Sequence, residues 1–312
     1  PRLIGLQGRL QFDRAGMRLS EASARAGEGA QAVLLTAPLV EIADMTQQAL
    51  LQVRAESTSS APQVLRLIQQ SALNTLLSDA LAEAQVRGDM QTRFDLRLPL
   101  LNLKETQVQG NLIFKGVDLR MQAETPWLEN MQGQLQFQET GFDLRQLQAQ
   151  LWGGPVSLEG GMRPPSNLRA SPARIEFQAR GRVSAEGLRT AKEFYPLDWL
   201  AQHSQGSTNY TAQLAWRDGK PDLTVNSNLE GMAVHLPAPL GKPSSSNRPL
   251  NIVLRSQQEK SGPHDQIQVT LADTVRVAYL RNLTGKVPQV VRGVWGVGIP
   301  VQQMPAWPDS GV

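Results

Sequence analysis

Residues 90–100 read MQTRFDLRLPL, and apolar and polar side chains alternate along this stretch. Successive side chains of a β-strand point to opposite faces of the sheet, so the alternation predicts a strand with one apolar and one polar face. At about 3.3 Å per residue this strand would be roughly 35 Å long, against the usual five or six residues, which span about 17–20 Å. One face would carry Met90, Thr92, Phe94, Leu96, Leu98 and Leu100, and the other Gln91, Arg93, Asp95, Arg97 and Pro99.

The same period-two pattern recurs along most of the chain. Short turn sequences such as Gly153–Pro155 and Arg217–Lys220 separate the alternating stretches, and Gly, Pro and Asp favour such turns. We therefore expect an antiparallel meander of many hairpins. Further alternating stretches are 108–114, 135–137, 147–151, 156–158, 175–183, 210–216, 223–229, 250–254, 267–271 and 275–279.

Two segments depart from the period of two. From Pro62 to Ala84 the apolar residues recur at the i, i+3, i+4 spacing of an amphipathic helix, with Ser59 or Ser60 as its cap. A second helix is expected to start after Ser184 and to run through Leu188, Ala191 and Phe194. Pro196 is expected to interrupt or kink it, and a short continuation to end near Ala201.

An internal repeat indicates how the chain is organised. Residues 3–29 align with residues 128–154 without a gap, and the order helix, glycine, alternating strand also occurs twice. Such repetition favours one continuous domain extended along one axis. We expect β-strands of a first unit at 1–57, an amphipathic helix at 58–87, strands of a second unit plus a linker at 88–172, a strand and kinked helix at 173–203, and strands of a truncated third unit at 204–312.

Composition excludes several classes of protein. The absence of cysteine rules out thiol catalysis, disulfides and Cys-ligated zinc. The net charge is +3 and the basic residues are scattered, which argues against a nucleic-acid partner. No apolar stretch approaches the ~20 residues of a membrane span. Because the chain opens at Pro1 without Met, we expect an internal fragment of a longer protein, with any anchor or export signal outside it.

Candidate catalytic groups are sparse. His203, His235 and His264 are far apart in sequence, and we expect surface or strand-end histidines. Phosphate-binding loops, zinc-protease motifs and nucleophile elbows do not occur in the sequence. Acidic residues are spread singly on polar strand faces. We expect neither an enzyme nor a bound metal or cofactor.

The apolar strand faces must be covered, because a wet apolar sheet is an aggregation hazard. Two helices are too few to cover them, which leaves three arrangements. Two sheets can pack as a sandwich, one sheet can close into a barrel, or one long sheet can bend into a trough that holds apolar ligand. The facing residues are mostly Leu, Val, Ile and Met, which mildly favours the trough.

The segment Leu128–Gly161, LENMQGQLQFQETGFDLRQLQAQLWGGPVSLEGG, carries a family resemblance. It resembles the AsmA-like superfamily, and most closely the large YhdP-type bacterial envelope proteins. A second stretch, Gly231–Lys242, is similar to a family strand that runs into an LPaPlgK sequence, and Gly293–Val312 looks like the start of a further unit. The matching positions of the first segment are Met131, Gly133, Leu135, Phe137, Gly141, Phe142, Leu147, Ala149, Gly153, Gly154, Pro155, Val156, Leu158 and Gly160.

This resemblance implies a fold and an activity. The implied fold is mainly β, with a long curved antiparallel sheet forming an elongated apolar groove and two short amphipathic helices. The implied role is movement of phospholipids between the inner and outer membranes of a diderm bacterium. The implied place is the periplasm, as part of an inner-membrane-anchored protein. The partners would be phospholipid acyl chains, and the membrane through segments outside this fragment.

We expect a lipid conduit that performs no chemistry, with acyl chains on the apolar strand faces and headgroups near a polar seam. The alternative is a non-catalytic, all-β structural or scaffold protein of the cell envelope, whose apolar faces pack together dry. A hydrolase would need paired carboxylates in a cleft, of which the sequence gives no sign. The expected groove lining is Phe94, Leu96, Leu98, Leu112, Phe114, Leu135, Phe137, Ile175, Phe177, Leu214, Val225, Ile252 and Val269.

Overall fold

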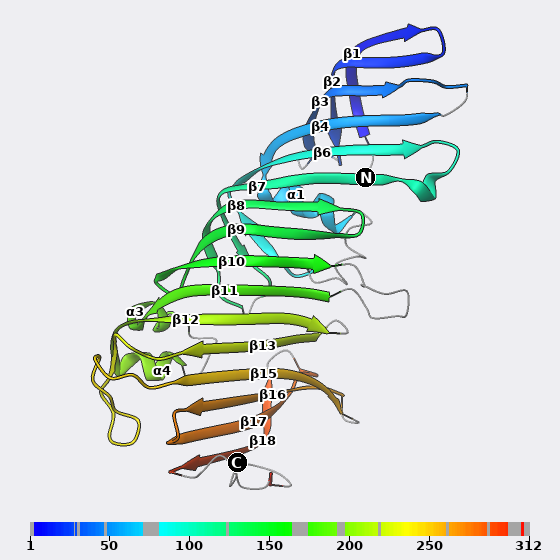
Figure 1. Cartoon of the computed structure of the whole chain (residues 1–312). Helices are drawn as coiled ribbons and strands as arrows, with labels where there is room; N and C mark the ends of the chain where they lie inside the picture. The colour runs from blue at the N-terminus through cyan, green and yellow to red at the C-terminus, as the bar shows by residue number, and fades with distance from the viewer. Residues whose placement is uncertain are drawn as a thin grey trace. The chain divides into compact units, whose positions relative to one another are not determined.

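A computed structural model describes most of the chain as antiparallel β-strands (Figure 1). It divides into two compact units: unit 1 comprises Pro1–Ala149 and Gly161–Pro164, and unit 2 comprises Gln150–Gly160 and Pro165–Val312. The mainly β, antiparallel fold expected from the alternation is confirmed in each unit. The described residues are 3–27, 29, 32–46, 49–70, 81–122, 125–163, 174–191, 197–217, 220–259, 262–285, 288–298 and 307–308.

In unit 1 the strands pair with their sequence neighbours in the order β1–β2–β3–β4–β6–β7–β8, all antiparallel. The short strand β5 pairs with β7 beyond the end of β6. The elements are β1 (Leu3–Asp13), β2 (Gly16–Ala26), β3 (Val33–Ile42), β4 (Leu50–Ser60), α1 (Ala61–Gln69), β5 (Gln85–Arg87), β6 (Asp89–Pro99), the 3₁₀ turn η2 (Leu103–Glu105), β7 (Gln107–Arg120), β8 (Leu128–Gln138) and β9 (Gly141–Leu151).

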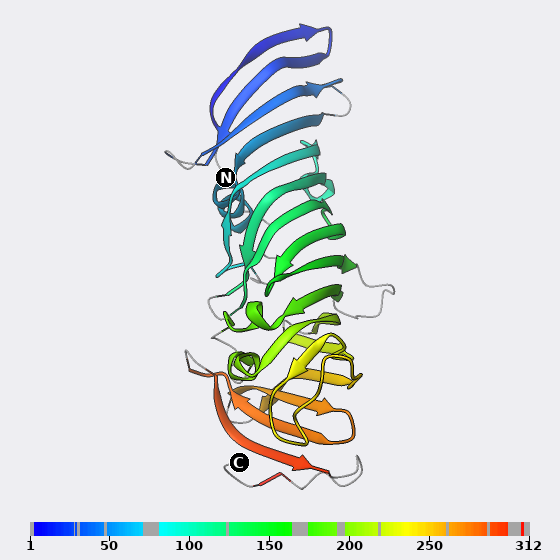
Figure 2. The same cartoon turned by 90° about the vertical axis from the view of Figure 1, so that its left-hand side faces the viewer.

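In unit 2 the antiparallel order is β11–β12–β13–β15–β16–β17–β18, and the short strand β14 pairs with the start of β12. Figure 2 shows the strands of each unit following one another as the rungs of a ladder. The elements are β10 (Gly154–Arg163), β11 (Arg174–Ser184), α3 (Ala185–Leu188), α4 (Leu197–Gln202), β12 (Ser204–Arg217), β13 (Lys220–Ser227), β14 (Met232–Val234), β15 (Leu250–Glu259), β16 (Gly262–Leu271), β17 (Val275–Asn282) and β18 (Gln289–Val297).

Helix α1 begins as expected but ends earlier. Ser60 is its N-cap, its backbone N–H donates to Oε1 of Gln63 at 3.3 Å, and a proline stands in the first turn. The apolar spacing predicted a helix through Ala84, and this is wrong at the C-terminal end. Residues 81–83 form a turn, closed by a hydrogen bond from Ala84 N to Leu81 O at 3.2 Å, that leads directly into β5. Residues 71–80 lie outside the described residues.

The second predicted helix is confirmed at its start and at its end, but it was expected to continue through Ala191, and it stops at Leu188, where Arg189 and Thr190 form a turn. Ser184 is the N-cap of α3, because its Oγ accepts a hydrogen bond from Gly187 N at 3.0 Å. Helix α4 ends at Gln202, one residue after the predicted end. The predicted interruption at Pro196 falls on residues 192–196, outside the described residues.

The repeat seen in the sequence has a counterpart in the backbone of unit 1. Glu21 in β2 and Gln146 in β9 are 125 positions apart, and both have left-handed backbone angles, with φ of 52° and 51°. Three residues further on, Ala24 and Ala149 are both buried. Non-glycine residues adopt this conformation rarely, so its recurrence at one offset marks a shared hairpin design rather than chance similarity of composition.

Candidate functional site

In unit 2 the strand registers join apolar side chains into rows that cross neighbouring strands. Predicted lining residues Phe177 and Leu214 are direct partners, and Val225, Ile252 and Val269 share one row. Ile175 lies in a third row, opposite Trp216. We call this surface the apolar face of unit 2. Its first two rows are Phe177–Leu214–Leu223–Leu254–Ile267–Tyr279 and Ala179–Ala212–Val225–Ile252–Val269–Val277–Trp295.

Unit 1 carries an apolar face of the same kind. Leu96 and Leu98 lie in rows that cross from β1 to β6, and Leu112 is the direct partner of Leu135. Phe94 and Phe137 lie on either side of Gly110, and Phe114 lies opposite Gly133. The structure therefore brings the seven predicted residues of this unit to one face. The two long rows are Leu10–Leu19–Val40–Val53–Leu96–Val108 and Phe12–Met17–Ile42–Leu51–Leu98.

The predicted lining residues are partly accessible rather than packed as a core. Of the thirteen, Leu112 is buried, with 8% of its surface exposed, and each of the others is half-buried. Residues in the interior of a dry sheet sandwich are generally buried, because facing side chains interdigitate. Half-burial over both apolar faces leaves room for contact with apolar molecules.

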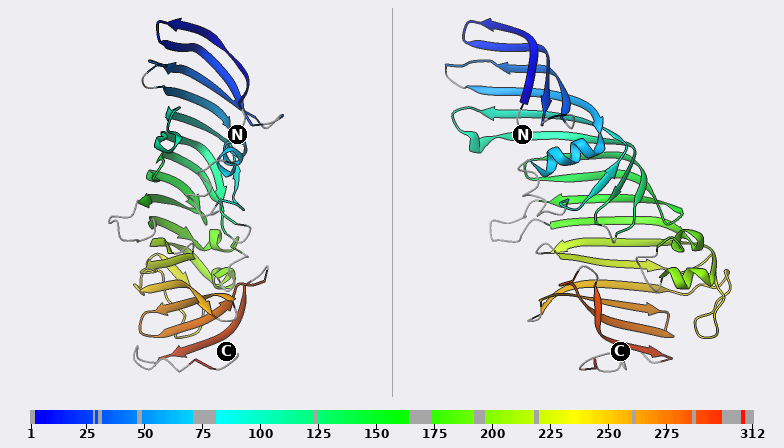
Figure 3. Two further views of the ribbon diagram at one scale, coloured as in Figure 1. Left: turned by 90° about the vertical axis from the view of Figure 1, so that its right-hand side faces the viewer. Right: turned by 180° about the vertical axis from the view of Figure 1, so that it is seen from behind.

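One end of the apolar face of unit 1 lies under α1. The helix contacts β3, β4, β5 and β6, and Figure 3 shows it against one face of these strands. Its residues Ala61 and Val64 are buried. Ser57 and Met90, which stand at this end of the apolar face, are also buried. Thr58, which follows Ser57 and points to the opposite face of the sheet, is exposed. The helix therefore covers the apolar side and leaves the polar side open.

In unit 2, α3 and α4 occupy the corresponding position at the junction of β11 and β12. Helix α3 contacts both strands, and α4 contacts β12. The apolar-face residues at this end, Val183 and Thr208, are buried, as are Ala185 and Ala201 of the two helices. Each apolar face thus has a helix-covered end and an opposite end, which we call the helix-distal edge.

The helix-distal edge of unit 1 is apolar. Leu100, Leu101 and Leu103 follow β6, and Leu101 is 85% exposed. The turn that carries them is internally bonded: Asn102 Nδ2 donates to Glu105 Oε1 at 2.7 Å, and Thr106 Oγ1 donates to Leu103 O at 2.6 Å. The exposure of these leucines is therefore a property of an ordered turn.

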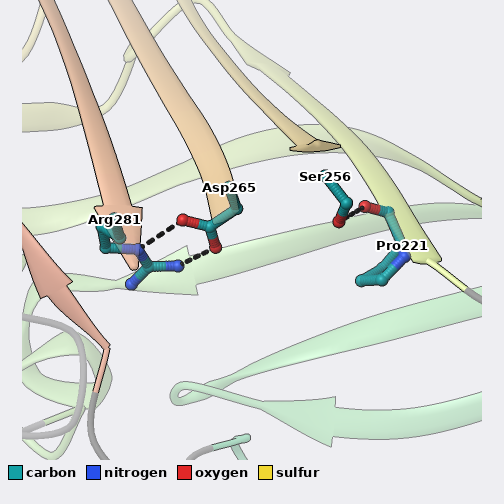
Figure 4. A network of polar contacts seen from close by, with 4 residues as sticks. All are labelled: Pro221, Ser256, Asp265 and Arg281. Carbon is teal, nitrogen blue, oxygen red and sulfur yellow. Dashed lines mark hydrogen bonds and ion pairs between the residues drawn. The ribbon is translucent and has the colours of Figure 1, made fainter. Parts of the chain in front are cut away.

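The helix-distal edge of unit 2 ends in a polar row. The register pairs Asp265 with Arg281. This pair lies two residues further along each strand than the Ile267–Tyr279 pair, and therefore on the same face of the sheet. Arg281 Nε donates to Asp265 Oδ1 at 2.8 Å and Nη2 donates to Oδ2 at 2.5 Å. Ser256 Oγ on the next strand donates to Pro221 O at 2.8 Å (Figure 4).

The electrostatics of this row are dominated by the ion pair. Burial lowers the pKa of Arg281, but its hydrogen bonds to Asp265 and the charge of that carboxylate raise the pKa overall. Burial also raises the pKa of Tyr279, the next apolar-face residue on β17. The arginine is therefore a permanent cation, held in one orientation by a bidentate acceptor.

Sequence reasoning missed this ion pair, although a signal for it exists. In Ile267, Val269 and Leu271 the apolar side falls on odd numbers, so the odd-numbered Asp265 is a charge at an apolar-face position. Arg281 stands in the same way two residues after Tyr279. When a charged residue at the end of a strand occupies a position that the alternation assigns to the apolar face, the apolar face is predicted to stop at that residue. The partner could not be found from the sequence, because the register between β16 and β17 was unknown.

The histidines differ from expectation in two respects. His264, expected at the surface or a strand end, does stand at the start of β16 but is buried, with Nδ1 2.9 Å from Gly262 O. His203 and His235 are neighbours in space, because His235 N donates to His203 O at 2.7 Å. Within the described part of the chain, no three His, Asp or Glu side chains form a group that could hold a metal ion.

Two hollows on the surface of the described residues lie over polar rows rather than over the apolar rows. One of about 780 Å³ in unit 1 runs between rows that contain two ion pairs, Arg54–Asp95 at 3.2 Å and Arg93–Glu56 at 3.5 Å. Another, of about 680 Å³ in unit 2, is bordered by Asn226, Asn251 and other polar residues. The charged walls of the first hollow suit water better than acyl chains.

A family model described as YhdP protein matches residues 1–312. No curated protein and no solved structure matches the chain. Among the described residues, no helix is both long enough and apolar enough to cross a membrane.

Proposed function

Because the chain belongs to the YhdP family of bacterial envelope proteins, we propose that its apolar faces carry phospholipids between the inner and outer membranes. In this proposal the protein performs no chemistry on the lipid. Acyl chains lie along the apolar rows, and headgroups lie at the helix-distal edges, where water has access. The fragment acts in the periplasm, as part of a longer protein anchored in the inner membrane.

The observation that carries the proposal is the continuity of the half-buried rows. In unit 2 a single row passes through Val225, Ile252 and Val269 on successive strands, with apolar residues on both sides of it. Transfer of a CH₂ group from water contributes about 0.8 kcal/mol, so an acyl chain of about sixteen carbons gains on the order of 10 kcal/mol on such a surface.

Continuity also supports movement rather than fixed binding. The rows consist of aliphatic and aromatic side chains that make non-directional contacts, so successive positions along a row offer an acyl chain similar free energies. A polar group in the middle of a row would instead form a fixed stop. The helices cover the apolar face at one end of the strands and leave the neighbouring strands joined through their registers.

Site-specific photocrosslinking at two adjacent residues tests the proposal. Leu98 is half-buried on the apolar face, and Arg97 is exposed on the polar face of the same strand. A photoreactive amino acid at position 98 is expected to label phospholipid in cells, and one at position 97 is not. Equal labelling at both positions, or purified protein free of phospholipid by native mass spectrometry, would support the dry scaffold instead.

A further inference from the structure

We propose that Arg281, oriented by Asp265, binds the phosphate of a phospholipid headgroup at the helix-distal edge of unit 2. This inference rests on the proposed function and gives it a headgroup contact, which the apolar rows cannot supply. The ligand chemistry is a phosphate diester attached to two acyl chains. The inference concerns one edge of unit 2 and involves residues that β15, β16 and β17 bring together.

The first argument is position. Asp265 pairs with Arg281, and the next pair on the same face is Ile267–Tyr279. No register shift occurs between β16 and β17. The guanidinium is therefore on the apolar face and at its boundary. A lipid whose chains lie on Ile267 and Tyr279 places its polar end within reach of this boundary and away from the end that α3 and α4 cover.

The second argument is pre-organisation. The side chain of Asp265 is 6% exposed and that of Arg281 is 26% exposed, so the carboxylate is the inner member of the pair and the guanidinium the outer one. Asp265 binds Nε and Nη2, and among the described residues no partner for Nη1 occurs. The two N–H groups of Nη1 and the second N–H of Nη2 remain for an outer anion, and arginine suits phosphate through planar, charge-assisted hydrogen bonds.

The third argument concerns energy. Taking a carboxylate and a guanidinium out of water is costly, and a well-packed apolar pair at the same place is often at least as stable. Asp265 and Arg281 stand one row beyond the Ile267–Tyr279 row, on the face that is apolar through that row and the Val269–Val277 row. A purely structural clamp explains the pair less well than a cation that has to remain at the edge of the apolar face.

Binding measurements with two lipids that share their acyl chains test the inference. The probes are dioleoylphosphatidylglycerol and dioleoylglycerol in the same detergent, titrated against the purified chain by native mass spectrometry. Arg281→Lys keeps the positive charge beside Asp265 but loses the planar donors. It is expected to weaken phosphatidylglycerol binding about tenfold, as for one lost charged hydrogen bond, and to leave dioleoylglycerol binding unchanged.

A second variant separates orientation from charge. Asp265→Asn leaves Arg281 with its charge but removes the bidentate carboxylate that orients it, so phosphatidylglycerol is expected to bind more weakly than to the unchanged chain, although a competing negative charge is gone. Tighter binding would show that Arg281 acts only as a point charge and would overturn the orienting role of Asp265. The matched control is Arg180→Gln, which removes an exposed arginine from the polar face of β11 in the same unit and should change neither affinity.

The double variant Asp265→Asn/Arg281→Gln avoids a buried, unpaired charge and keeps the test valid if Arg281→Lys fails to fold. It too should lose only phosphatidylglycerol affinity, and circular dichroism checks its fold. Equal loss of both lipids, or no loss of either, overturns the headgroup inference while the conduit stands. If the unchanged chain binds neither lipid, the conduit proposal itself fails. If Arg281→Lys alters binding of inorganic phosphate alone and not of the lipid, the site is a free-anion site and the inference is wrong.

Discussion

Phe137 lies across Gly110: a Cβ atom at position 110 would stand 2.6 Å from Cζ of Phe137. The two residues are direct partners in the β7–β8 register, and Phe94 of β6 faces Gly110 from the other side. The glycine thus provides the space in which an aromatic ring of the apolar face lies over the strand.

We expect Gly110→Ala to destabilise the chain by about 1–3 kcal/mol, because the added methyl group overpacks against the Phe137 ring and the Arg93 carbonyl. Denaturant unfolding monitored by circular dichroism measures the change. The control Gln138→Ala, at an exposed position on β8, should stay within about 0.5 kcal/mol of the unchanged chain. Similar stability of the two variants would show that the ring moves aside without cost.

Leu98→Glu is expected to abolish lipid binding and to leave the fold intact. Leu98 is half-buried, so a carboxylate there can reach water in the empty protein but would be buried beneath an acyl chain. The readout is phospholipid co-purified with the variant, quantified by mass spectrometry. Arg97→Glu, one residue away on the polar face, is the matched control; a loss of lipid in this control as well would assign the effect to net charge.

Leu112→Glu behaves differently, because Leu112 is 8% exposed. A carboxylate at this position is desolvated whether or not lipid is present, so we expect loss of stability by several kcal/mol or failure to fold. Thermal unfolding of Leu98→Glu and Leu112→Glu side by side distinguishes the two sites. Equal melting temperatures would mean that the apolar face is as open at Leu112 as at Leu98.

Alkaline pH should destabilise the chain through Tyr210. Burial raises the pKa of Tyr210 to about 12, from the ordinary value of 10.0. Between these two values the unfolded chain loses the phenolic proton while the folded chain retains it, so the free energy of unfolding falls as pH rises through this window. Below pH 10 the contribution of Tyr210 is fully present.

The Tyr210→Phe variant isolates this effect. The Tyr210 hydroxyl is buried and has no hydrogen-bond partner among the described residues, so its removal should cost little stability at neutral pH. Urea unfolding midpoints at a series of pH values are the measurement, and the variant should lose less stability than the unchanged chain between pH 10 and 12. Parallel curves for the two proteins would assign the alkaline loss to other groups.

Lys242 is expected to hold the segment between β13 and β15 in place. Its Nζ donates hydrogen bonds to Leu229 O at 2.7 Å and to Met232 O at 2.5 Å, and the residue is buried. Lys242→Met leaves these carbonyls without their donor and should raise amide exchange of residues 231–234 by about tenfold or more. Lys220→Met, which removes a bond to Gln258, is the control and should leave these amides unchanged.

Which face each strand presents was predictable because side-chain alternation is a local property. All seven predicted residues of unit 1 came to one face for this reason. Assigning faces by counting alternate residues along a strand fails where the register of strand pairing shifts. Between Lys115 and Val117 the left-handed Gly116 inserts an extra residue, and Val117, which a count from Phe114 assigns to the polar face, is fully buried against Met131.

Features that depend on partners far away in sequence were not predictable. Helix α1 ends at Gln69 although its apolar spacing continues, and β5, which begins at Gln85, pairs with β7, a strand that comes later in the chain. The contact of Asp265 with Arg281 needs the register of two strands joined by a turn. Lys242 lies in a stretch rich in Pro and Ser, and nothing in that composition indicates a buried ammonium group.

The ladder of registers sets the increment by which such a chain can grow or shrink. To extend each row, a new strand needs only one apolar residue that points to the same face. Antiparallel pairing returns the chain to its starting edge after two strands. A whole hairpin such as β15 and β16 is therefore the smallest unit whose insertion or deletion preserves the rows. If this hairpin were deleted, Val225 of β13 and Val277 of β17 would still meet as partners in one row. Length in this architecture is a modular variable, adjustable without redesign of either face.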